Sequence, residues 1–537
     1  METMRLSRLI EARCRAEPQA TAFVQDGRRW SNQAFAESVD QAAAWLRSRG
    51  IGRGDAVALW LLNSPQWIAL LLALARLGAR AIPINTRYRS DEVAYLLGAS
   101  GARLLITHGQ HPRLDALGIL AHVTPAAAPG LQEVAVLETP ADPAPACAWP
   151  LRAFGAGAMP PGPEPDGSEP EDVVILFSTS GTTKAPKLVM HTQATLIGHA
   201  RRCAAVLGLD QPDAVLLAML PMCGVFGLNS VLAALAGRAV VVIQDVFDAP
   251  QAVALMQAER VTHAFGSDEM FRRLAQGAAG PRPFPHARYF GFGAFTSSFG
   301  PFARECVERG MPLHGLYGSS EVQALFSAQP GSLPLEERLL GGGRPMAAEQ
   351  TCLRVRDTQT GALLPDGMPG ELEIRSPGNF VGYFGNPQAS AQAMHEGYFR
   401  TGDLGYLRGD GSFVFMSRLG DAMRLGGHLV NPEEIEEAIK QHEGVEDAHV
   451  VSADVDGQPR PVAFVVASPE GSFEPQALLA RLRLSVAGFK VPCRVWIVEG
   501  FPQTVGVNGL KTSRVLLRKQ AEERLAAEQG NDARRAT

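Results

Sequence analysis

The residues with the greatest capacity for chemistry lie in one short polar loop that directly follows an apolar stretch. The sequence VVILFSTSGTTKAPKLVMHT begins with five apolar residues, Val173 to Phe177. Hydroxyl groups, a flexible glycine and two cations placed after a buried strand form a concave set of hydrogen-bond donors, which suits a polyphosphate. The loop lacks the glycine spacing of a Walker motif. A Ser/Thr-rich turn would explain STSGTT alone, but the lysines and the proline favour a phosphate loop formed by Ser180, Gly181, Thr182, Thr183, Lys184 and Lys187.

Lysine is rare in this chain, and its positions are therefore informative. Only six lysines occur among the 50 lysine and arginine residues, and two of them are in the phosphate loop. Where arginine supplies most of the positive charge, a lysine indicates a site that needs a compact, flexible point charge. The same reasoning makes Lys511, in FPQTVGVNGLKTSRVLL, a candidate, with a solvated surface lysine as the alternative.

The elements that must position these residues read as alternating strands and helices. Val57 to Leu62 is a predicted buried strand, a helix begins at Pro65 after the N-cap Ser64, and a second strand follows at Ala81 to Ile84. The pattern recurs as a strand at 214–220, a helix ending at 237, a strand at 239–243, a helix from 248 and a strand at 261–265. Continuously apolar strands separated by helices predict parallel sheets that helices cover.

The rest of the chain has a different character. Residues 124–172 are rich in Pro, Ala and Gly, which predicts a surface connector. After about Thr351 the segments CLRVR, ELEIR and SFVFM alternate, which predicts an antiparallel subdomain. From Pro432 the chain reads helix, strand, strand, helix, and it ends in a charged tail with no evident core.

Composition excludes several classes of protein. The 537 residues are 46% hydrophobic and 20% charged with a net charge of −5, which is typical of a soluble globular protein of two to four domains. Without a basic tract, a nucleic-acid partner is not expected. The seven cysteines form no C-x-x-C pair, which favours reduced thiols in the cytoplasm. The N-terminus has no signal-peptide pattern, and Arg76 and Arg80 interrupt the most apolar stretch, so no membrane segment is expected.

Four motifs in a fixed order identify a family resemblance. LFSTSGTTKAPKLV, LHGLYGSSE, YFRTGDLG and FPQTVGVNGLKT span nearly the whole chain. With them the sequence resembles the adenylate-forming superfamily of acyl-CoA synthetases, nonribosomal adenylation domains and luciferases. The resemblance implies an α/β fold: a large N-terminal domain of βαβ-built sheets with a small antiparallel barrel-like subdomain, here residues 1–419, and a small mobile α+β C-terminal domain, here residues 420–537.

The resemblance also implies roles for residues of the large domain. Tyr317 would stack on adenine, Ser320 would contact the α-phosphate, and Glu321 would ligate magnesium, whose usual site combines one carboxylate with substrate phosphates. Lys184 and Leu188 stand where the family often has glycine. Further nucleotide contacts are implied for Gly293 and Ala294. The implied acyl-pocket residues are Gly224, Phe226, Ser230, Gly291 and Leu316.

Other implied roles belong to the two later motifs. Asp403 would bind the ribose hydroxyls, Arg418 would make the second ribose contact, and Gly420 would be the pivot between domains. Arg424 and Gly427 would serve the second half-reaction. Lys511 matches the catalytic lysine that reaches the carboxylate and the α-phosphate. The implied catalytic set is Lys511, Lys187, Ser320 and Glu321.

The implied activity is that of a carboxylate:CoA ligase that uses ATP, Mg²⁺ and coenzyme A, forms an acyl-adenylate and then an acyl-CoA, and releases pyrophosphate and AMP. The first alternative is a stand-alone enzyme that loads a carboxylic acid onto the phosphopantetheine of a carrier protein. A light-emitting oxygenase or a non-catalytic paralogue would share the fold. An α-amino acid substrate is disfavoured, because the segment 226–228 lacks the expected aspartate.

The size of the acid follows from three pocket positions. Gly224 and Gly291 should widen the pocket, whereas Leu316 should narrow its floor. We therefore expect a medium-sized apolar or ring-bearing carboxylate, larger than acetate. Neither the particular acid nor the oligomeric state follows from the sequence.

Overall fold

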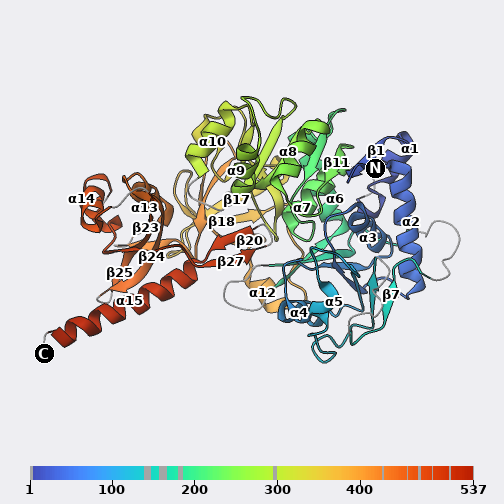
Figure 1. The fold of residues 1–537 in the computed structure, drawn as a ribbon, viewed down its shortest axis with the longest axis horizontal. Helices are drawn as coiled ribbons and strands as arrows, with labels where there is room; N and C mark the ends of the chain where they lie inside the picture. Colours follow the sequence, from blue (N-terminus) through green and yellow to red (C-terminus); the bar gives the residue numbers. More distant parts are fainter. Residues whose placement is uncertain are drawn as a thin grey trace. The chain divides into compact units, whose positions relative to one another are not determined.

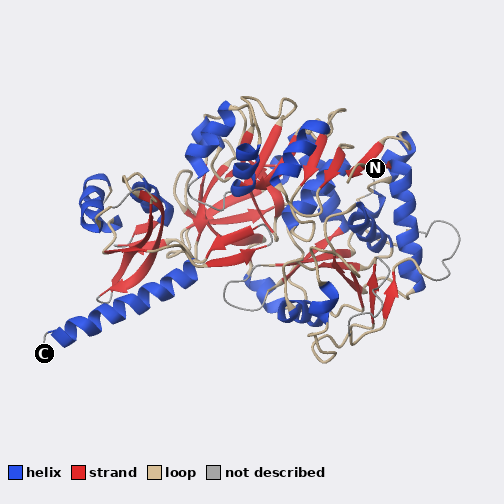
Figure 2. Cartoon of the chain, in the orientation of Figure 1, coloured by secondary structure: helices blue, strands red, loops and turns tan. Residues whose placement is uncertain are grey.

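A computed structural model describes residues 4–137, 147–156, 166–179, 186–293, 299–425, 428–455, 458–469, 473–486, 488–506 and 509–535. The chain divides into two compact units, which are described here one at a time. The first comprises Met1–Gly293, Glu305–Leu353 and Ile374–Phe399, and the second comprises Ala294–Arg304, Arg354–Glu373 and Arg400–Thr537. Both mix helices and strands (Figure 2), as the predicted α/β fold requires.

The first unit contains a large sheet with a parallel centre. Its strands lie in the order β16 (Gly342–Pro345), β15 (Gln323–Ala328), β14 (Leu313–Ser319), β13 (Tyr289–Gly293), β12 (His263–Ser267), β10 (Val215–Ala218), β11 (Val240–Ile243), β1 (Thr21–Gln25) and β2 (Arg28–Ser31). The pairs from β14 to β1 are parallel, and the pairs β14–β15, β15–β16 and β1–β2 are antiparallel. The chain therefore turns back at β15, directly after the YGSSE motif.

A second sheet of the first unit carries the predicted phosphate loop. Its order is β7 (Leu151–Ala153), β6 (Glu133–Val136), β5 (Leu104–Thr107), β3 (Ala56–Trp60), β4 (Arg80–Pro83), β8 (Val173–Ser178) and β9 (Leu188–Thr192). All pairs are parallel except the β8–β9 hairpin. The phosphate loop is the connection of this hairpin.

Local sequence signals explain why the predicted βαβ unit forms. The hydroxyl of Ser64 accepts a hydrogen bond from the backbone N–H of Trp67, and Pro65 is the first residue of α3 (Pro65–Arg76). Almost every residue of α3 is buried, as expected for a helix that is apolar on all sides. The neighbouring helix α2 (Asn32–Ser48) is capped in the same way by Ser31.

Two helices next to the candidate site are α6 (Gln193–Leu207) and α7 (Val225–Ala236). The remaining helices before residue 400 are η1 (Leu6–Arg8), α1 (Glu11–Ala16), α4 (Ser90–Ser100), α5 (Ala116–Leu120), α8 (Ala249–Ala258), α9 (Asp268–Gly277), α10 (Phe299–Glu308), α11 (Leu335–Arg338), η2 (Ala348–Gln350) and α12 (Pro387–Gln392). None of the described helices combines the length and apolar character that crossing a membrane requires.

The second unit contains the predicted later strands and a C-terminal α+β region. The first group has the order β17 (Cys352–Arg356), β18 (Gly370–Arg375), β20 (Tyr398–Leu407) and β21 (Phe413–Arg418). The short β19 (Met394–His395), which belongs to the first unit, pairs with the start of β20. The C-terminal elements are β22 (Met423–Leu425), β23 (His428–Val430), α13 (Pro432–Lys440), β24 (Val445–Val455), β25 (Gln458–Ala467), α14 (Pro475–Ser485), η3 (Gly488–Lys490), β26 (Arg494–Ile497), β27 (Gln503–Gly506), β28 (Gly509–Thr512) and α15 (Arg514–Arg535).

Two expectations about irregular segments were wrong. The stretch 124–172 is more than a connector, because β6 and β7 lie within it and extend the second sheet by hydrogen bonds to backbone groups. The C-terminal segment is the long helix α15, not a tail without a core (Figure 1). Its residues Leu517, Ala521 and Leu525 recur every four positions and pack with Val451 and Phe464 of β24 and β25.

A buried ion pair joins α15 to α13. The carboxylate of Glu436 has no exposed surface and accepts hydrogen bonds from Arg514 Nη2 at 3.0 Å and from the backbone N–H of Val450 at 2.7 Å. Burial alone would raise the pKa of Glu436, but hydrogen bonds from His449 and Arg514 and the charge of Arg514 lower it to about 2. Glu436 is therefore ionised at neutral pH and holds Arg514, the first residue of α15.

We predict that Glu436→Gln destabilises the second unit by roughly 3 kcal/mol at pH 7, because it leaves the buried arginine without its counter-charge. The pKa of this carboxylate is about 2 in the folded chain and 4.5 ordinarily, so its contribution is complete above pH 4.5 and is lost as the pH falls toward 2. Hydrogen exchange of the α13 and α15 amides from pH 7 to pH 3 measures both effects. Glu434→Gln, which removes an exposed partner of Lys490, is the control, and equal exchange in both variants would contradict the prediction.

Candidate active site

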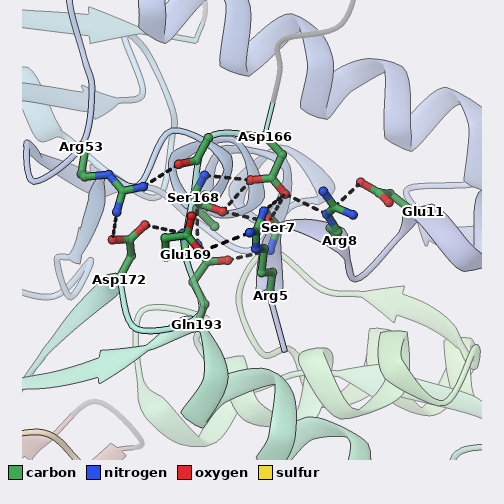
Figure 3. Close-up of polar contacts among 12 residues, drawn as sticks. Arg5, Ser7, Arg8, Glu11, Arg53, Asp166, Ser168, Glu169, Asp172 and Gln193 are labelled. Atoms are coloured by element: carbon green, nitrogen blue, oxygen red, sulfur yellow. Dashed lines mark hydrogen bonds and ion pairs between the residues drawn. The ribbon is translucent and has the colours of Figure 1, made fainter. Parts of the chain in front are cut away.

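The base of the β8–β9 hairpin is held by a network of polar contacts (Figure 3). Asp172 precedes β8, pairs with Arg53 and accepts a hydrogen bond from the backbone N–H of Glu169 at 2.7 Å. Gln193 follows β9, and its backbone N–H donates to the carbonyl of Asp172 at 3.0 Å. The side chain of Gln193 donates to the carbonyl of Ala75 at 3.0 Å. The two ends of the hairpin are thus tied to each other, and Gln193 also ties the hairpin to α3.

The N-terminal segment closes this network from the other side. The backbone N–H of Ser7 donates to Gln193 Oε1 at 3.0 Å, and the hydroxyl of Ser7 donates to Asp166 Oδ2 at 2.8 Å. Arg8 Nε also donates to Asp166 Oδ2, at 3.1 Å. Although burial raises the pKa of Asp166, hydrogen bonds from Ser168, Ser7 and Arg8 lower it overall. Asp166 is therefore a charged anchor for the chain that leads into β8.

Part of the predicted phosphate loop lies outside the described residues: Ser180, Gly181, Thr182, Thr183 and Lys184. Its neck is described. The backbone N–H of Thr179 donates to the carbonyl of Lys187 at 2.9 Å, and the N–H of Lys187 donates to Thr179 Oγ1 at 3.1 Å. The ammonium of Lys187 is 4.5 Å from the ring centroid of Tyr383.

The YGSSE motif forms a strained turn between β14 and β15. Tyr317 is buried, and a Cβ at Gly318 would lie 2.6 Å from the Cα of Ala324, so only glycine fits there. Gln323 and Leu325 have φ angles of +70° and +60°, a region that non-glycine residues rarely adopt. Such strain persists only where the surroundings fix the backbone.

Gln323 shows how this turn is fixed. Its Nε2 donates to the carbonyls of Thr195 at 2.9 Å and Gly378 at 3.1 Å, and its Oε1 accepts from Asn229 Nδ2 at 3.1 Å. The side chain thereby joins α6, α7 and the segment after β18. A buried amide with both ends engaged stabilises one backbone conformation of the turn.

Two buried histidines donate hydrogen bonds to backbone carbonyls of the same turn. His191 Nε2 is 2.7 Å from the carbonyl oxygen of Ser320, and His199 Nε2 is 2.7 Å from that of Ala324. Because a carbonyl oxygen only accepts, each Nε2 carries the proton and donates. Burial lowers the pKa of both histidines to about 4, so they are neutral at ordinary pH.

Glu321 lies at the open side of the turn. Its carboxylate accepts a hydrogen bond from the hydroxyl of Tyr383 at 3.0 Å through Oε1, and its carbonyl accepts from the N–H of Phe380 at 2.6 Å. The residue is half-buried. A hard carboxylate oxygen beside a phosphate loop fits Mg²⁺, which takes one or two carboxylates and completes its shell with substrate phosphates and water.

Three of the predicted acyl-pocket residues lie near Phe265: Gly291, Leu316 and Phe226. A Cβ at Gly291 would lie 2.6 Å from Leu316 Cδ1 and 2.7 Å from Phe265 Cδ1, so glycine lets these two side chains approach each other. The ring of Phe226, in the first turn of α7, is centred 6.5 Å from that of Phe265.

The other two pocket candidates lie on α7. Gly224 is the N-cap of this helix, and the hydroxyl of Ser230 donates to the carbonyl of Gly227 at 2.8 Å. The Ser230 hydroxyl is thus engaged within its own helix. The roles of all five pocket residues stay predictions.

Asp403 and Arg418 come together in the second unit. They are opposite each other in the antiparallel pair β20–β21, and Arg418 Nη1 is 2.9 Å from Asp403 Oδ1. Asp403 is buried, whereas about half of the Arg418 side chain is exposed. Gly420 follows β21 with open space around its Cα, as a pivot needs.

For the remaining candidates only the backbone is placed, or nothing is described. Lys511 lies in β28 opposite Thr504, and Arg424 lies in β22 opposite Leu429; their side chains are outside the described part. Gly293 is the last residue of β13. Ala294 and Gly427 lie outside the described residues.

Comparison with known proteins identifies the class of enzyme to which this fold and site belong. Residues 10–384 match the family model for AMP-binding enzymes, and residues 434–506 match that for the AMP-binding enzyme C-terminal domain. The chain therefore belongs to the AMP-binding enzyme family, which confirms the resemblance drawn from its motifs.

Several relatives and solved structures are similar to this chain over most of its length. A 2-succinylbenzoate–CoA ligase of Geobacillus kaustophilus is 30% identical over 89% of this chain and 91% of its own, and a feruloyl-CoA synthase of Amycolatopsis sp. is 29% identical over 92% and 94%. An amide bond synthetase of Marinactinospora thermotolerans has a TM-score of 0.81 with 25% identity over 97% of this chain and 99% of its own. An O-succinylbenzoate coenzyme A synthetase of Bacillus subtilis, solved with AMP, has a TM-score of 0.78 with 21% identity over 96% and 97%, which supports the fold alone.

Sequence reasoning missed the residues that hold the motifs in place: His191, His199, Gln323 and Tyr383. His191 lies in the apolar segment KLVMHT that follows the phosphate loop. A histidine within an apolar strand was a visible signal. Its partner Ser320 is 129 residues away, however, so only the fold reveals the contact.

We predict that the first unit loses stability as the pH falls from 6.5 to 4. His191, His199 and His314 each have a pKa of about 4 in the folded chain against 6.5 ordinarily, so the unfolded chain binds more protons in this range. The cost approaches roughly 1.4 kcal/mol per pH unit for each histidine. Urea unfolding followed by tryptophan fluorescence measures it, since five of the six tryptophans belong to this unit.

The variant His191→Gln tests whether His191 contributes to this pH dependence, because the glutamine amide keeps a donor near the Nε2 position but does not titrate. Its stability should fall less steeply between pH 6.5 and 4 than that of the wild type. The same slope in both proteins would contradict the prediction.

Proposed function

We propose that the chain is an ATP-dependent carboxylate–CoA ligase that forms an acyl-adenylate and pyrophosphate, and then an acyl-CoA and AMP. The observation that carries this proposal is the grouping of Lys187, Ser320 and Glu321 in the first unit, with Tyr383 touching both the lysine and the carboxylate. A cation and a metal-binding carboxylate at the neck of a phosphate loop suit a nucleoside triphosphate. The relatives named as CoA ligases support the acid and thiol substrates.

The chemistry explains why such a site needs charge and no nucleophile. A carboxylate resists attack because its oxide is a poor leaving group, and transfer of AMP to it creates a good one. Ser180, Gly181, Thr182, Thr183 and Lys187 bind the phosphates, Tyr317 stacks on adenine beside Gly293 and Ala294, and Ser320 contacts the α-phosphate. Glu321 holds magnesium, which when bound offsets the charge of the triphosphate. This is electrostatic stabilisation of the transition state.

The later residues complete the proposal. Asp403 binds the ribose hydroxyls, and Arg418, whose Nη1 is 2.9 Å from Asp403 Oδ1, makes a second contact to the ribose. Residues 420–537 form a mobile domain that pivots at Gly420. Lys511 serves adenylation in one orientation, and Arg424 and Gly427 serve thioester formation in the other.

The substrate proposal is a medium-sized apolar or ring-bearing carboxylate. Gly224, Phe226, Ser230, Gly291 and Leu316 form its pocket, and the ring-bearing acids in the names of two relatives support this class. The carrier-protein alternative is not favoured, since these relatives are named as CoA ligases. We also propose a cytoplasmic location, because the seven cysteines are free thiols.

A panel of carboxylates tests the proposed function. AMP release is measured with acetate, octanoate, benzoate, ferulate and 2-succinylbenzoate in the presence of ATP, Mg²⁺ and CoA, and again with a phosphopantetheinylated carrier or an amine in place of CoA. We expect the highest kcat/KM for a ring-bearing or medium-chain acid with CoA. Acetate as the best acid would overturn the pocket assignment. Turnover only with the carrier or the amine, and not with CoA, would overturn the assignment of CoA as the acyl acceptor.

Lys511 has a specific kinetic prediction. Lys511→Ala should slow adenylation by a hundredfold or more, on the scale of a lost oxyanion donor at roughly 3 kcal/mol. It should spare the conversion of a supplied acyl-adenylate to acyl-CoA, because the lysine has then left the site. Lys511→Arg should also be slow, since a planar fork cannot replace a compact ammonium.

Single-turnover kinetics of each half-reaction measures these effects. Lys519→Ala is the matched control, because Lys519 is exposed on α15 and pairs only loosely with Glu523 at 3.9 Å. Equal losses in both half-reactions, or no loss in adenylation, would return Lys511 to the role of a surface lysine.

A further inference from the structure

The segment 380–384 runs alongside the phosphate-loop hairpin. The backbone N–H of Met190 donates to the carbonyl of Gly382 at 3.0 Å, and the N–H of Val381 donates back to the carbonyl of Met190 at 3.0 Å. The N–H of Phe384 donates to the carbonyl of Leu188 at 2.8 Å. Tyr383 forms an antiparallel bridge with Val189 of β9. The segment therefore adds a short extended stretch to the edge of the hairpin.

The side chain of Tyr383 is placed by contacts of its own. Tyr383 is 5% exposed, and its ring is centred 4.8 Å from that of Phe380. Its backbone N–H donates to Ser390 Oγ at 2.8 Å. The N–H of Phe380 in turn donates to the carbonyl of Glu321 at 2.6 Å. The ring thus packs on Phe380, whose backbone is tied to the YGSSE turn.

Tyr383 contacts both charged groups of the candidate site. Its hydroxyl donates to Glu321 Oε1 at 3.0 Å, and the ammonium of Lys187 lies 4.5 Å from its ring centroid. A cation over an aromatic face is attracted by the ring, and a neutral donor occupies one carboxylate oxygen without neutralising the charge. Within the part of the chain that the structure describes, Glu321 Oε2 and the Lys187 ammonium have no hydrogen-bond partner, so Oε2 can take a metal ion and the ammonium can take a phosphate.

We propose that Tyr383 is a positioning residue for the adenylation site, which orients Glu321 toward the magnesium of MgATP through its hydroxyl and holds Lys187 through its ring. This inference rests on the proposed function. Groups that hold a metal ligand in place commonly change metal affinity by tenfold to a hundredfold when they are removed.

Two variants separate the two contacts. Tyr383→Phe removes the hydroxyl and keeps the ring, whereas Tyr383→Leu removes both. Tyr406→Phe is the matched control, because Tyr406 is a partly buried residue of β20 without an assigned role. Calorimetric titration of ATP at a series of Mg²⁺ concentrations gives a binding readout that is independent of turnover, and ATP–pyrophosphate exchange under the same conditions gives the adenylation rate.

For Tyr383→Phe we expect the Mg²⁺ concentration that gives half-maximal ATP affinity to rise about tenfold, while the affinity at saturating Mg²⁺ stays within twofold of wild type. Tyr383→Leu should show this shift and also weaker ATP binding at saturating Mg²⁺, since Lys187 loses its support. Tyr406→Phe should match the wild type. A merely structural tyrosine would lower the unfolding temperature without moving the Mg²⁺ dependence.

The outcomes distinguish this inference from the function on which it rests. If the wild type binds ATP in a Mg²⁺-dependent manner and Tyr383→Phe has the same Mg²⁺ dependence, the positioning role is wrong and the proposed function stands. If the wild type itself binds no MgATP, both are wrong. Should Tyr383→Leu fail to fold, the Tyr383→Phe comparison still decides, because it removes a single oxygen atom.

Discussion

The candidate site depends on one constraint: the buried carbonyl groups of a strained turn must each find a hydrogen-bond donor. Ser320 and Ala324 lie on either side of Gln323, whose φ of +70° would be costly without support. His191 and His199 supply the two donors, both at 2.7 Å, and burial keeps both imidazoles neutral. A charged histidine would bring an unpaired cation into the core, so the same burial that makes the donors reliable also makes the site sensitive to acid. The direction in which Glu321 faces follows from this fixed turn.

The phosphate-loop hairpin, which contacts this turn, is held by backbone and side-chain hydrogen bonds of its own. Its base is tied by Gln193, Asp172 and the N-terminal Ser7, and its outer edge is covered by the segment 380–384. Because these ties involve backbone groups and buried side chains, they fix the neck of the loop at Thr179 and Lys187. The hairpin and the turn then meet through Tyr383, and the fold itself determines where Lys187, the proposed phosphate-binding cation, lies relative to Glu321, the proposed metal-binding carboxylate.

The sequence predicted those features whose causes are local. Ser64 and Pro65 define the start of α3 within three residues, and the apolar strands on each side allow only a parallel pairing, so the βαβ unit and the α/β fold were predictable. The helix α15 was not, because its stripe of Leu517, Ala521 and Leu525 is diluted among charged residues. The strands β6 and β7 were hidden in a stretch rich in small residues and proline. Motif order indicated which side chains share a site, but the link from Tyr383 to Glu321 joins positions 62 residues apart and exists only once the chain is folded.

The choice of lysine at position 187 follows from the same geometry. This chain uses arginine for most of its positive charges, and arginine can also stack on a tyrosine ring. A guanidinium over Tyr383, however, would present a flat fork of donors beside Glu321 Oε1, the oxygen that Tyr383 already contacts, and a paired carboxylate would be a poor ligand for a metal ion. The ammonium of lysine is compact and has no such fork. It can therefore contact the ring face without displacing the hydrogen bond from the Tyr383 hydroxyl to Glu321. Two opposite charges can then stay close enough to serve the proposed triphosphate site without cancelling each other, because the neutral tyrosine contacts both and keeps them apart.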